Sequence, residues 1–143
     1  MANVLVVANQ TAESDELLAA MRERAERGDC AFTVLVPATP HGVQWAANMY
    51  SDKGVEEAEQ HRDAMVERMR SAGIEVTDTI VGDPDPLGAI QDACNQGSYD
   101  ELIVSTLPRH MSKWLHLDLQ SKAAHATGLP VTSIEASKPK VDA

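Results

Sequence analysis

Short apolar runs alternate with segments of helical periodicity along this chain, and that alternation limits the fold more than any other feature. The first run, NVLVVAN, spans residues 3–9 and is typical of a strand covered on both faces. Four more strands are predicted, at residues 30–37, 74–82, 99–106 and 130–134. Strands that alternate with helices form parallel sheets. The sequence therefore predicts an α/β fold, an open five-stranded parallel sheet with helices on both faces. The 74–82 run is more polar and is expected nearer an edge.

Four helices are predicted between these strands. Thr11 and Asp85 are expected to cap two of them, and Pro86 is expected in the first turn of the second. Apolar residues at helical spacing mark the buried faces: Leu17, Leu18, Met21 and Ala25; Val55, Ala58, Met65 and Met69; Leu87, Ile90, Ala93 and Cys94. A fourth helix is predicted at residues 118–127. Glycines are expected to end the helices: Gly28, Gly73, Gly97 and Gly128.

The length and charge of the chain restrict its class. Its 143 residues suit one domain, expected at residues 1–135, with a disordered tail at 136–143. The formal net charge of −10 argues against nucleic acid or an anionic membrane as partner. Without a long apolar run or a signal peptide, the protein is expected to be cytoplasmic. Cys30 and Cys94 stand far apart among apolar neighbours, which favours buried free thiols over a disulfide or a metal pair.

Ligands of parallel sheets bind at the carboxyl ends of the strands, near the point where the strand order reverses. That rule selects four segments: residues 9–11, 36–50, 82–85 and 105–118. The last segment has no glycine but carries three basic or titratable side chains, those of Arg109, His110 and Lys113. Two interpretations stay open for them. They form either a solvated basic turn or an anion site that uses side-chain charge in place of backbone N–H donors.

The stretch VGDPDPLGAIQDACNQGSYDELIVST resembles the Gly-Asp-Pro turn, third helix and following strand of the universal stress protein family. GLPVTSI resembles the closing strand of that family, and the resemblance extends over nearly the whole chain, to about Ile134. It implies a Rossmann-like five-stranded sheet of the adenine nucleotide α-hydrolase-like type. It also implies a homodimer formed through the last strand, by Val131, Thr132, Ser133 and Ile134.

Members of this family divide into those that bind ATP and those that do not. The binders carry a glycine, two residues, a second glycine, nine residues, and a third glycine followed by serine or threonine. Ser105, Pro108, Asp118 and Leu119 stand at those four positions in this sequence. Binders also tend to have an aspartate after the first strand, where this chain has Asn9. The resemblance thus implies a member without the glycine-rich motif and without an ATP cofactor.

The four replacements all act against phosphate binding. Ser105 has a side chain where the motif leaves clearance, and Pro108 removes one backbone donor and stiffens the turn. Asp118 sets a carboxylate near the phosphate position, where like charges about 4 Å apart repel by roughly 1–4 kcal/mol. Leu119 removes a hydrogen bond that contributes about 1 kcal/mol. Each effect is modest, but they add in one direction.

Other candidate residues keep a structural and a functional interpretation. Ser105 and Thr106 either bond an anion or satisfy backbone groups where the strand ends. Asp118 fits a helix N-cap better than a functional carboxylate. Asp83 and Asp85 fit turn formation and capping better than a metal or acid–base role. The five histidines form no cluster with zinc-like spacing, so no metal site is expected.

Two segments are expected to contribute apolar side chains near the site. Residues 36–50 are expected to fold over the pocket mouth with Trp45 partly buried. Trp45 and Tyr50 either line a ligand pocket or cover the sheet edge. In the loop after the fourth strand, Trp114, Leu115 and Leu117 are expected to anchor an ordered turn.

The sequence thus favours a universal-stress-type protein with a degenerate nucleotide site. It would be a homodimer that acts by interaction or by sensing in a stress or regulatory setting, with no catalytic residue. The alternative is a nucleotide- or anion-binding module in which Arg109 and Lys113 supply the charge. Its candidate loop comprises Asn9, Ser105, Thr106, Arg109, His110 and Lys113. A third hypothesis, an enzyme of the nucleotide α-hydrolase-like group, needs a general base and a metal or oxyanion device, and the sequence identifies neither.

Overall fold

The computed structural model describes residues 1–9, 11, 12, 14–38, 52–107 and 118–136. The described chain contains a five-stranded sheet in the order β3-β2-β1-β4-β5, and every neighbouring pair of strands is parallel. The strands are β1 (Ala2–Val7), β2 (Cys30–Pro37), β3 (Val76–Gly82), β4 (Glu101–Thr106) and β5 (Val131–Glu135). The predicted fold class is confirmed.

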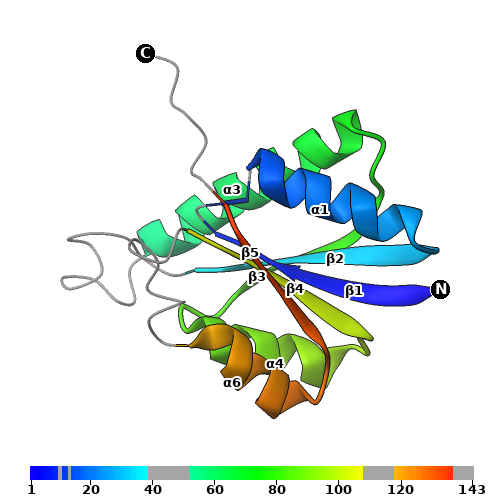
Figure 1. Ribbon diagram of the computed structural model, residues 1–143. Helices are drawn as coiled ribbons and strands as arrows, with labels where there is room; N and C mark the ends of the chain where they lie inside the picture. Colours follow the sequence, from blue (N-terminus) through cyan, green and yellow to red (C-terminus); the bar gives the residue numbers. More distant parts are fainter. Residues whose placement is uncertain (10, 13, 39–51, 108–117, 137–143) are drawn as a thin grey trace.

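Helices cover both faces of the sheet (Figure 1). Those in the described residues are α1 (Asp15–Glu26), α3 (Asp52–Ser71), α4 (Pro86–Gln96) and α6 (Leu119–Thr127). The apolar sides of α1 and α3 pack on one face, and those of α4 and α6 pack on the other. The molecule therefore has two cores, separated by the sheet.

β1 shows how one apolar run serves both cores. Val4 and Val6 belong to the cluster under α1 and α3, whereas Leu5 and Val7 belong to the cluster under α4 and α6. All four side chains are fully buried. Since successive side chains of a strand point to opposite faces, a central strand of a two-sided sheet needs an apolar residue at every position.

The strand order reverses at β1. The chain places β2 and β3 on one side of β1 and then places β4 on the other side, where residues 101–104 pair with residues 4–7. We call the region between the carboxyl ends of β1 and β4 the switch point. Open parallel sheets hold their ligands there. β3 and β5 are the two edge strands, as predicted for the more polar 74–82 run.

The C-terminal part of the described chain is packed further than the sequence predicted. β5 extends to Glu135, and Ala136 is buried. Ala136 also donates its N–H to the carbonyl of Thr106 over 2.7 Å, so it continues the alignment with β4. These contacts place Ala136, the first residue of the predicted disordered tail, in the fold. Residues 137–143 lie outside the described residues.

The start of α1 was predicted wrongly. Its N-cap is Ser14, whose Oγ accepts a hydrogen bond from the N–H of Leu17 over 3.2 Å, and Thr11 bonds elsewhere. Ser14 is the cap because it directly precedes the first helical residue, and from there its hydroxyl can reach an unpaired N–H of the first turn. Asp85 caps α4 as predicted and accepts from the N–H of Gly88 over 3.2 Å.

Burial was overestimated at several positions. Ala25 was predicted on the buried face of α1 but is exposed, and Leu18 and Leu87 are only partly buried. Val55 is 40% exposed. It lies in the first turn of α3, before Ala58, which is buried.

Cys30 and Cys94 are free thiols, as predicted, but both are only partly buried. Cys30 packs against the core under α1 and α3, and Cys94 packs against the core under α4 and α6. The sheet therefore separates the two sulfurs.

Candidate functional site

The switch point brings together polar residues of the predicted site. Asn9 and Thr11 follow β1, and Ser105 and Thr106 are the last residues of β4. All four are almost fully buried, with 1–3% of their surface exposed. Buried polar groups are tolerated only where they find hydrogen-bonding partners. Those partners decide which groups remain available to a ligand.

The hydroxyls of Thr11 and Ser105 bond to each other. Thr11 Oγ1 and Ser105 Oγ lie 2.6 Å apart, in a contact between residues 94 positions apart in the sequence. The bond joins the loop after β1 to the end of β4 across the switch point. A hydroxyl has one proton to donate, so the bond leaves at most one donor of the pair for any other group.

The amide of Asn9 fastens the same loop to the neighbouring strand. Asn9 Nδ2 donates to the carbonyl of Pro37, the last residue of β2, over 2.5 Å. In the universal stress protein family, which the sequence resembles, ATP-binding members tend to have an aspartate at this place. An ionised carboxylate has no proton to donate and cannot make this bond to a carbonyl. Asn9 is therefore suited to joining β1 and β2 in a way that aspartate is not.

The backbone of the loop after β1 is also engaged. The N–H of Ala12 donates to the carbonyl of Asn9 over 3.2 Å, and the N–H of Ser14 donates to the carbonyl of Thr11 over 3.0 Å. A phosphate cradle depends on several backbone N–H groups directed at the ligand. Two such donors of this loop are used by the loop itself.

Thr106 makes its described contacts with the chain around β5. Its Oγ1 lies 3.5 Å from the carbonyl of Ile134, at the outer limit of a hydrogen bond. Its own carbonyl accepts the N–H of Ala136. The next residue, Leu107, is 8% exposed. Of the two interpretations of Thr106, these contacts match the satisfaction of backbone groups where the strand ends.

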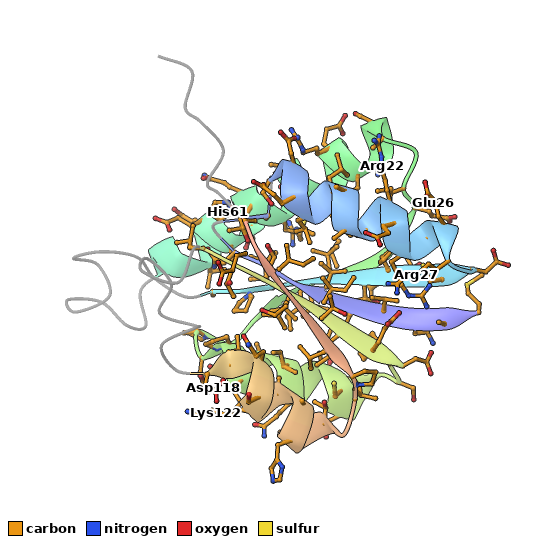
Figure 2. All side chains as sticks on the ribbon, in the orientation of Figure 1. Arg22, Glu26, Arg27, His61, Asp118 and Lys122 are labelled. Atoms are coloured by element: carbon orange, nitrogen blue, oxygen red, sulfur yellow. The ribbon has the colours of Figure 1, made fainter. Side chains whose placement is uncertain are left out.

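Asp118 begins α6 in a left-handed conformation, with φ 56° and ψ 45°. No other non-glycine residue among those described has a positive φ. Asp118 occupies the N-cap position, as predicted, but its side chain is exposed and makes no capping hydrogen bond. Figure 2 shows it on the side of the molecule where the carboxyl ends of the strands lie. This backbone conformation favours glycine, the residue that stands at this position in the glycine-rich motif of the family that the sequence resembles.

Part of the predicted site lies outside the described residues. These positions are Trp45, Tyr50, Pro108, Arg109, His110, Lys113, Trp114, Leu115 and Leu117. The segment expected to cover the pocket mouth, residues 36–50, is described only as far as Ala38.

Asp83 and Asp85 hold the turn before α4. Asp83 Oδ1 accepts the N–H of Asp85 over 2.9 Å, and Asp85 in turn caps the helix. Both side chains lie in the exposed part of the surface. These contacts match the turn and capping interpretation. Among the residues that the structure describes, no group of three or more His, Cys, Asp or Glu side chains is placed to hold a metal ion.

Charged and titratable groups also meet at the amino ends of the strands. Arg24 of α1 forms a partly buried ion pair with Glu101 at the start of β4. The hydrogen bond to Glu101 raises the pKa of Arg24 above its ordinary value. Burial raises the pKa of the Cys30 thiol, although the nearby Arg24 charge opposes the shift, and burial alone raises the pKa of Cys94. Raised thiol pKa values favour the unreactive protonated form.

A pocket of about 360 Å³ lies where the end of α3 meets the start of β3. It is lined by Val66, Arg70, Gly73, Ile74, Glu75 and Val76. Its lining includes the first residue of β3, so it is at the amino end of that strand and away from the switch point.

The predicted role of Thr11 was wrong. Thr11 was expected to cap α1, and its hydrogen bond to Ser105 was not predicted. One local signal was available: Ser14 directly precedes Asp15 and Glu16, the acidic residues of the first turn of α1. Acidic residues favour the first turn because they face the positive end of the helix dipole. That position identifies Ser14 as the cap and frees the Thr11 hydroxyl for another partner.

No protein-family model matches the chain, and no curated protein matches its sequence. Solved structures match its fold. A universal stress protein from Archaeoglobus fulgidus is 16% identical, with a TM-score of 0.63, and the match covers 94% of each chain. A universal stress protein in complex with cAMP is 17% identical, with a TM-score of 0.63 over 95% of this chain and 98% of that one.

A third structure, a universal stress protein family protein from Arabidopsis thaliana with AMP bound, is 14% identical. Its TM-score is 0.62, and the match covers 96% of this chain and 93% of that chain. At such low identity these likenesses establish the fold. The chain has the fold of the universal stress proteins, and the sequence resemblance is confirmed at that level.

Proposed function

We propose that this chain is a universal-stress-type protein whose nucleotide site is degenerate. It forms a homodimer and acts by interaction or by sensing in a stress or regulatory setting, without binding ATP. The proposal rests on the fold and on the condition of the polar groups at the switch point.

The bond between Thr11 and Ser105 is the observation that carries the proposal. Both hydroxyls are buried at the place where parallel sheets of this type hold ligands, and they bond to each other at 2.6 Å. The Asn9 amide beside them is bonded to Pro37. A ligand phosphate would have to displace these bonds, and an unpaired buried polar group costs about 1–3 kcal/mol.

Asp118 supports the same conclusion. Its left-handed backbone keeps the conformation that suits a glycine, but its side chain adds a carboxylate. That charge stands at the N-terminus of α6, where a phosphate would otherwise meet the positive end of the helix dipole. A carboxylate there competes with a phosphate for the same dipole and also repels it.

Two of the matching solved structures hold nucleotides, cAMP in one and AMP in the other. They make nucleotide binding the alternative for this chain. In that alternative, Arg109 and Lys113 supply charge to a rebuilt phosphate loop. Exposed ion pairs contribute only about 0.2–1 kcal/mol each, so two of them offset one of the four replacements in the motif and not all of them.

Calorimetry with ATP and magnesium tests the proposal directly. We expect no binding tighter than about millimolar, which corresponds to roughly −4 kcal/mol. Mass spectrometry of a denatured sample of the purified protein should likewise detect no released nucleotide. Micromolar ATP binding by the unaltered protein, abolished by Arg109→Ala, would refute the degenerate site and establish the rebuilt loop.

A further inference from the structure

The loop after β1 is fastened to the strands on both sides of β1. Asn9 Nδ2 bonds to the carbonyl of Pro37 at the end of β2, over 2.5 Å. Thr11 Oγ1 bonds to Ser105 Oγ near the end of β4, over 2.6 Å. Because β2 and β4 are the two neighbours of β1, these bonds draw the loop down onto the carboxyl edge of the sheet.

The described residues of this loop are also engaged in backbone hydrogen bonds and in packing. The N–H groups of Ala12 and Ser14 are bonded within the loop, to the carbonyls of Asn9 and Thr11. Ala8 and Ala12 are 0% and 3% exposed. Opening the loop toward a ligand therefore requires the side-chain bonds at its margins to break first.

We propose that the Thr11–Ser105 hydrogen bond is a latch that closes the switch point to phosphate groups. Thr11 and Ser105 thereby determine which ligands the site rejects, namely nucleotides and other ligands that present a phosphate. This inference rests on the proposed function, in which the unaltered protein binds no nucleotide. It assigns a distinct share of the exclusion to this one bond, in addition to the other changes in the motif.

The two residues of the latch contribute differently. The Ser105 side chain takes up space at the end of β4 and also holds the Thr11 hydroxyl. Ser105→Gly removes both effects and leaves a buried hydroxyl that lacks this partner, so the loop moves outward or accepts an anion in its place. Thr11→Val breaks the bond but keeps the volume of the side chain. Glycine at 105 should therefore increase phosphate binding more than valine at 11.

The test compares four variants with the unaltered protein. Ser105→Gly and Thr11→Val break the latch, and Thr11→Ser retains a hydroxyl that can form it. Thr127→Val is the control, because the Thr127 hydroxyl also makes a hydrogen bond within the fold, a partly buried one to the carbonyl of Ala123 over 2.7 Å, at the far end of α6. Inorganic phosphate and ATP with magnesium are titrated by calorimetry. Amide hydrogen exchange of residues 8–14 reports the state of the loop independently.

We expect Ser105→Gly to bind phosphate and ATP at least ten-fold more tightly, a change of about 1.4 kcal/mol. Exchange of the loop amides should become faster in Ser105→Gly and in Thr11→Val, with the smaller gain in binding for Thr11→Val. Thr11→Ser and Thr127→Val should leave loop exchange and binding as they are in the unaltered protein. If the loop amides exchange faster in both latch variants and neither variant binds phosphate more tightly, the proposal that this bond excludes phosphate is wrong.

The latch and the degenerate site fail in different ways. An unaltered protein without ATP binding, together with latch variants that gain none, overturns the latch alone. Micromolar ATP binding by the unaltered protein refutes the degenerate site and with it the latch. Loss of that binding in Thr11→Val would identify the hydroxyls as ligands of the phosphate.

Discussion

At the scale of single residues, the switch point is defined by the partners of its polar groups. Asn9, Thr11 and Ser105 carry the amide and hydroxyl groups that a nucleotide site uses, and each has a protein partner. A single hydrogen bond adds only about 0.5–1.5 kcal/mol to stability. A buried polar group left without a partner destabilises the protein by more than that, about 1–3 kcal/mol, so breaking one of these pairs is unfavourable. The chemical identity of such residues is therefore a weak guide to ligand binding without their contacts.

Asp118 tests the left-handed turn before α6. A left-handed conformation costs a residue with a β-carbon about 1–2 kcal/mol relative to glycine. We predict that Asp118→Gly is more stable than Asp118→Ala by about 1 kcal/mol. Both variants lack the carboxylate, so they share the loss of its interaction with the helix dipole. The measurement is the free energy of unfolding in urea, followed by circular dichroism.

The control for this prediction is Ser121, an exposed residue within α6. Inside a helix the order reverses, and Ser121→Ala should be more stable than Ser121→Gly by about 1 kcal/mol. If alanine is the more stable replacement at both positions, Asp118 does not adopt the left-handed conformation.

At the scale of elements, α6 closes one of the two cores directly beside the candidate site. Leu119, its first residue, is 3% exposed and belongs to the cluster that contains Ile90 of α4 and Val104 of β4. The glycine-rich motif of the family that the sequence resembles has a hydroxyl residue at this position. In this chain the position is a core position. Core packing and the phosphate motif therefore compete for residue 119.

Leu119→Ser should destabilise the protein by about 3–5 kcal/mol. The change removes buried methyl groups, leaves a cavity and buries a hydroxyl, and each of these is unfavourable. Leu119→Met conserves volume and should cost less than about 1.5 kcal/mol. Urea unfolding of both variants measures the difference. A loss below about 1 kcal/mol in Leu119→Ser would show that Leu119 is not part of the core.

At the scale of the whole molecule, the two edges of the sheet are unequal. At the β3 edge, the exposed Asp78 accepts the N–H of Thr79 at its Oδ1 over 2.8 Å and so places a carboxylate on an edge strand. Edge carboxylates and occupied N–H groups discourage pairing with another strand. β5 exposes Thr132 and Ser133, and it carries no charge before Glu135.

Among the described residues, no helix is long and apolar enough to cross a membrane.

We predict a homodimer in which two β5 edges meet across a twofold axis. In such an isologous contact each strand pairs with its own copy, so a charge placed on this short strand is brought close to the same charge on the other and is buried against it. Thr132→Lys should therefore shift the protein toward monomer. Val131→Lys should do so as well, although Val131 also packs against the core and is the less clean probe. Light scattering over a range of protein concentrations measures the mass.

Thr77 on β3 provides the control, because it is exposed on the opposite edge of the same sheet. Thr77→Lys should leave the mass of the dimer unchanged. A monomer mass at every concentration of the unaltered protein would rule out the dimer. Dissociation by Thr77→Lys and not by Thr132→Lys would move the contact to β3.

The sequence by itself determined the features that depend on neighbours along the chain. The continuous apolar run in β1 predicted a strand covered on both faces, because each position of a central strand packs into one of two cores. Asp85 was identified as a cap because its partner, Gly88, lies only three residues away. The rule that ligands bind at carboxyl ends also grouped Asn9, Ser105 and Thr106 before any contact was known.

Only the tertiary structure decided what those grouped residues do. Thr11 bonds to Ser105, 94 positions away, and local pattern cannot rank such a partner above a nearby helix N–H. The burial of Leu119 likewise follows from how α6 docks on β4 and α4, and the left-handed φ of Asp118 is known only from the folded chain. A hydroxyl or an apolar side chain takes its role from the groups that the fold places within a few ångströms. For this site, those groups come from the opposite ends of the chain.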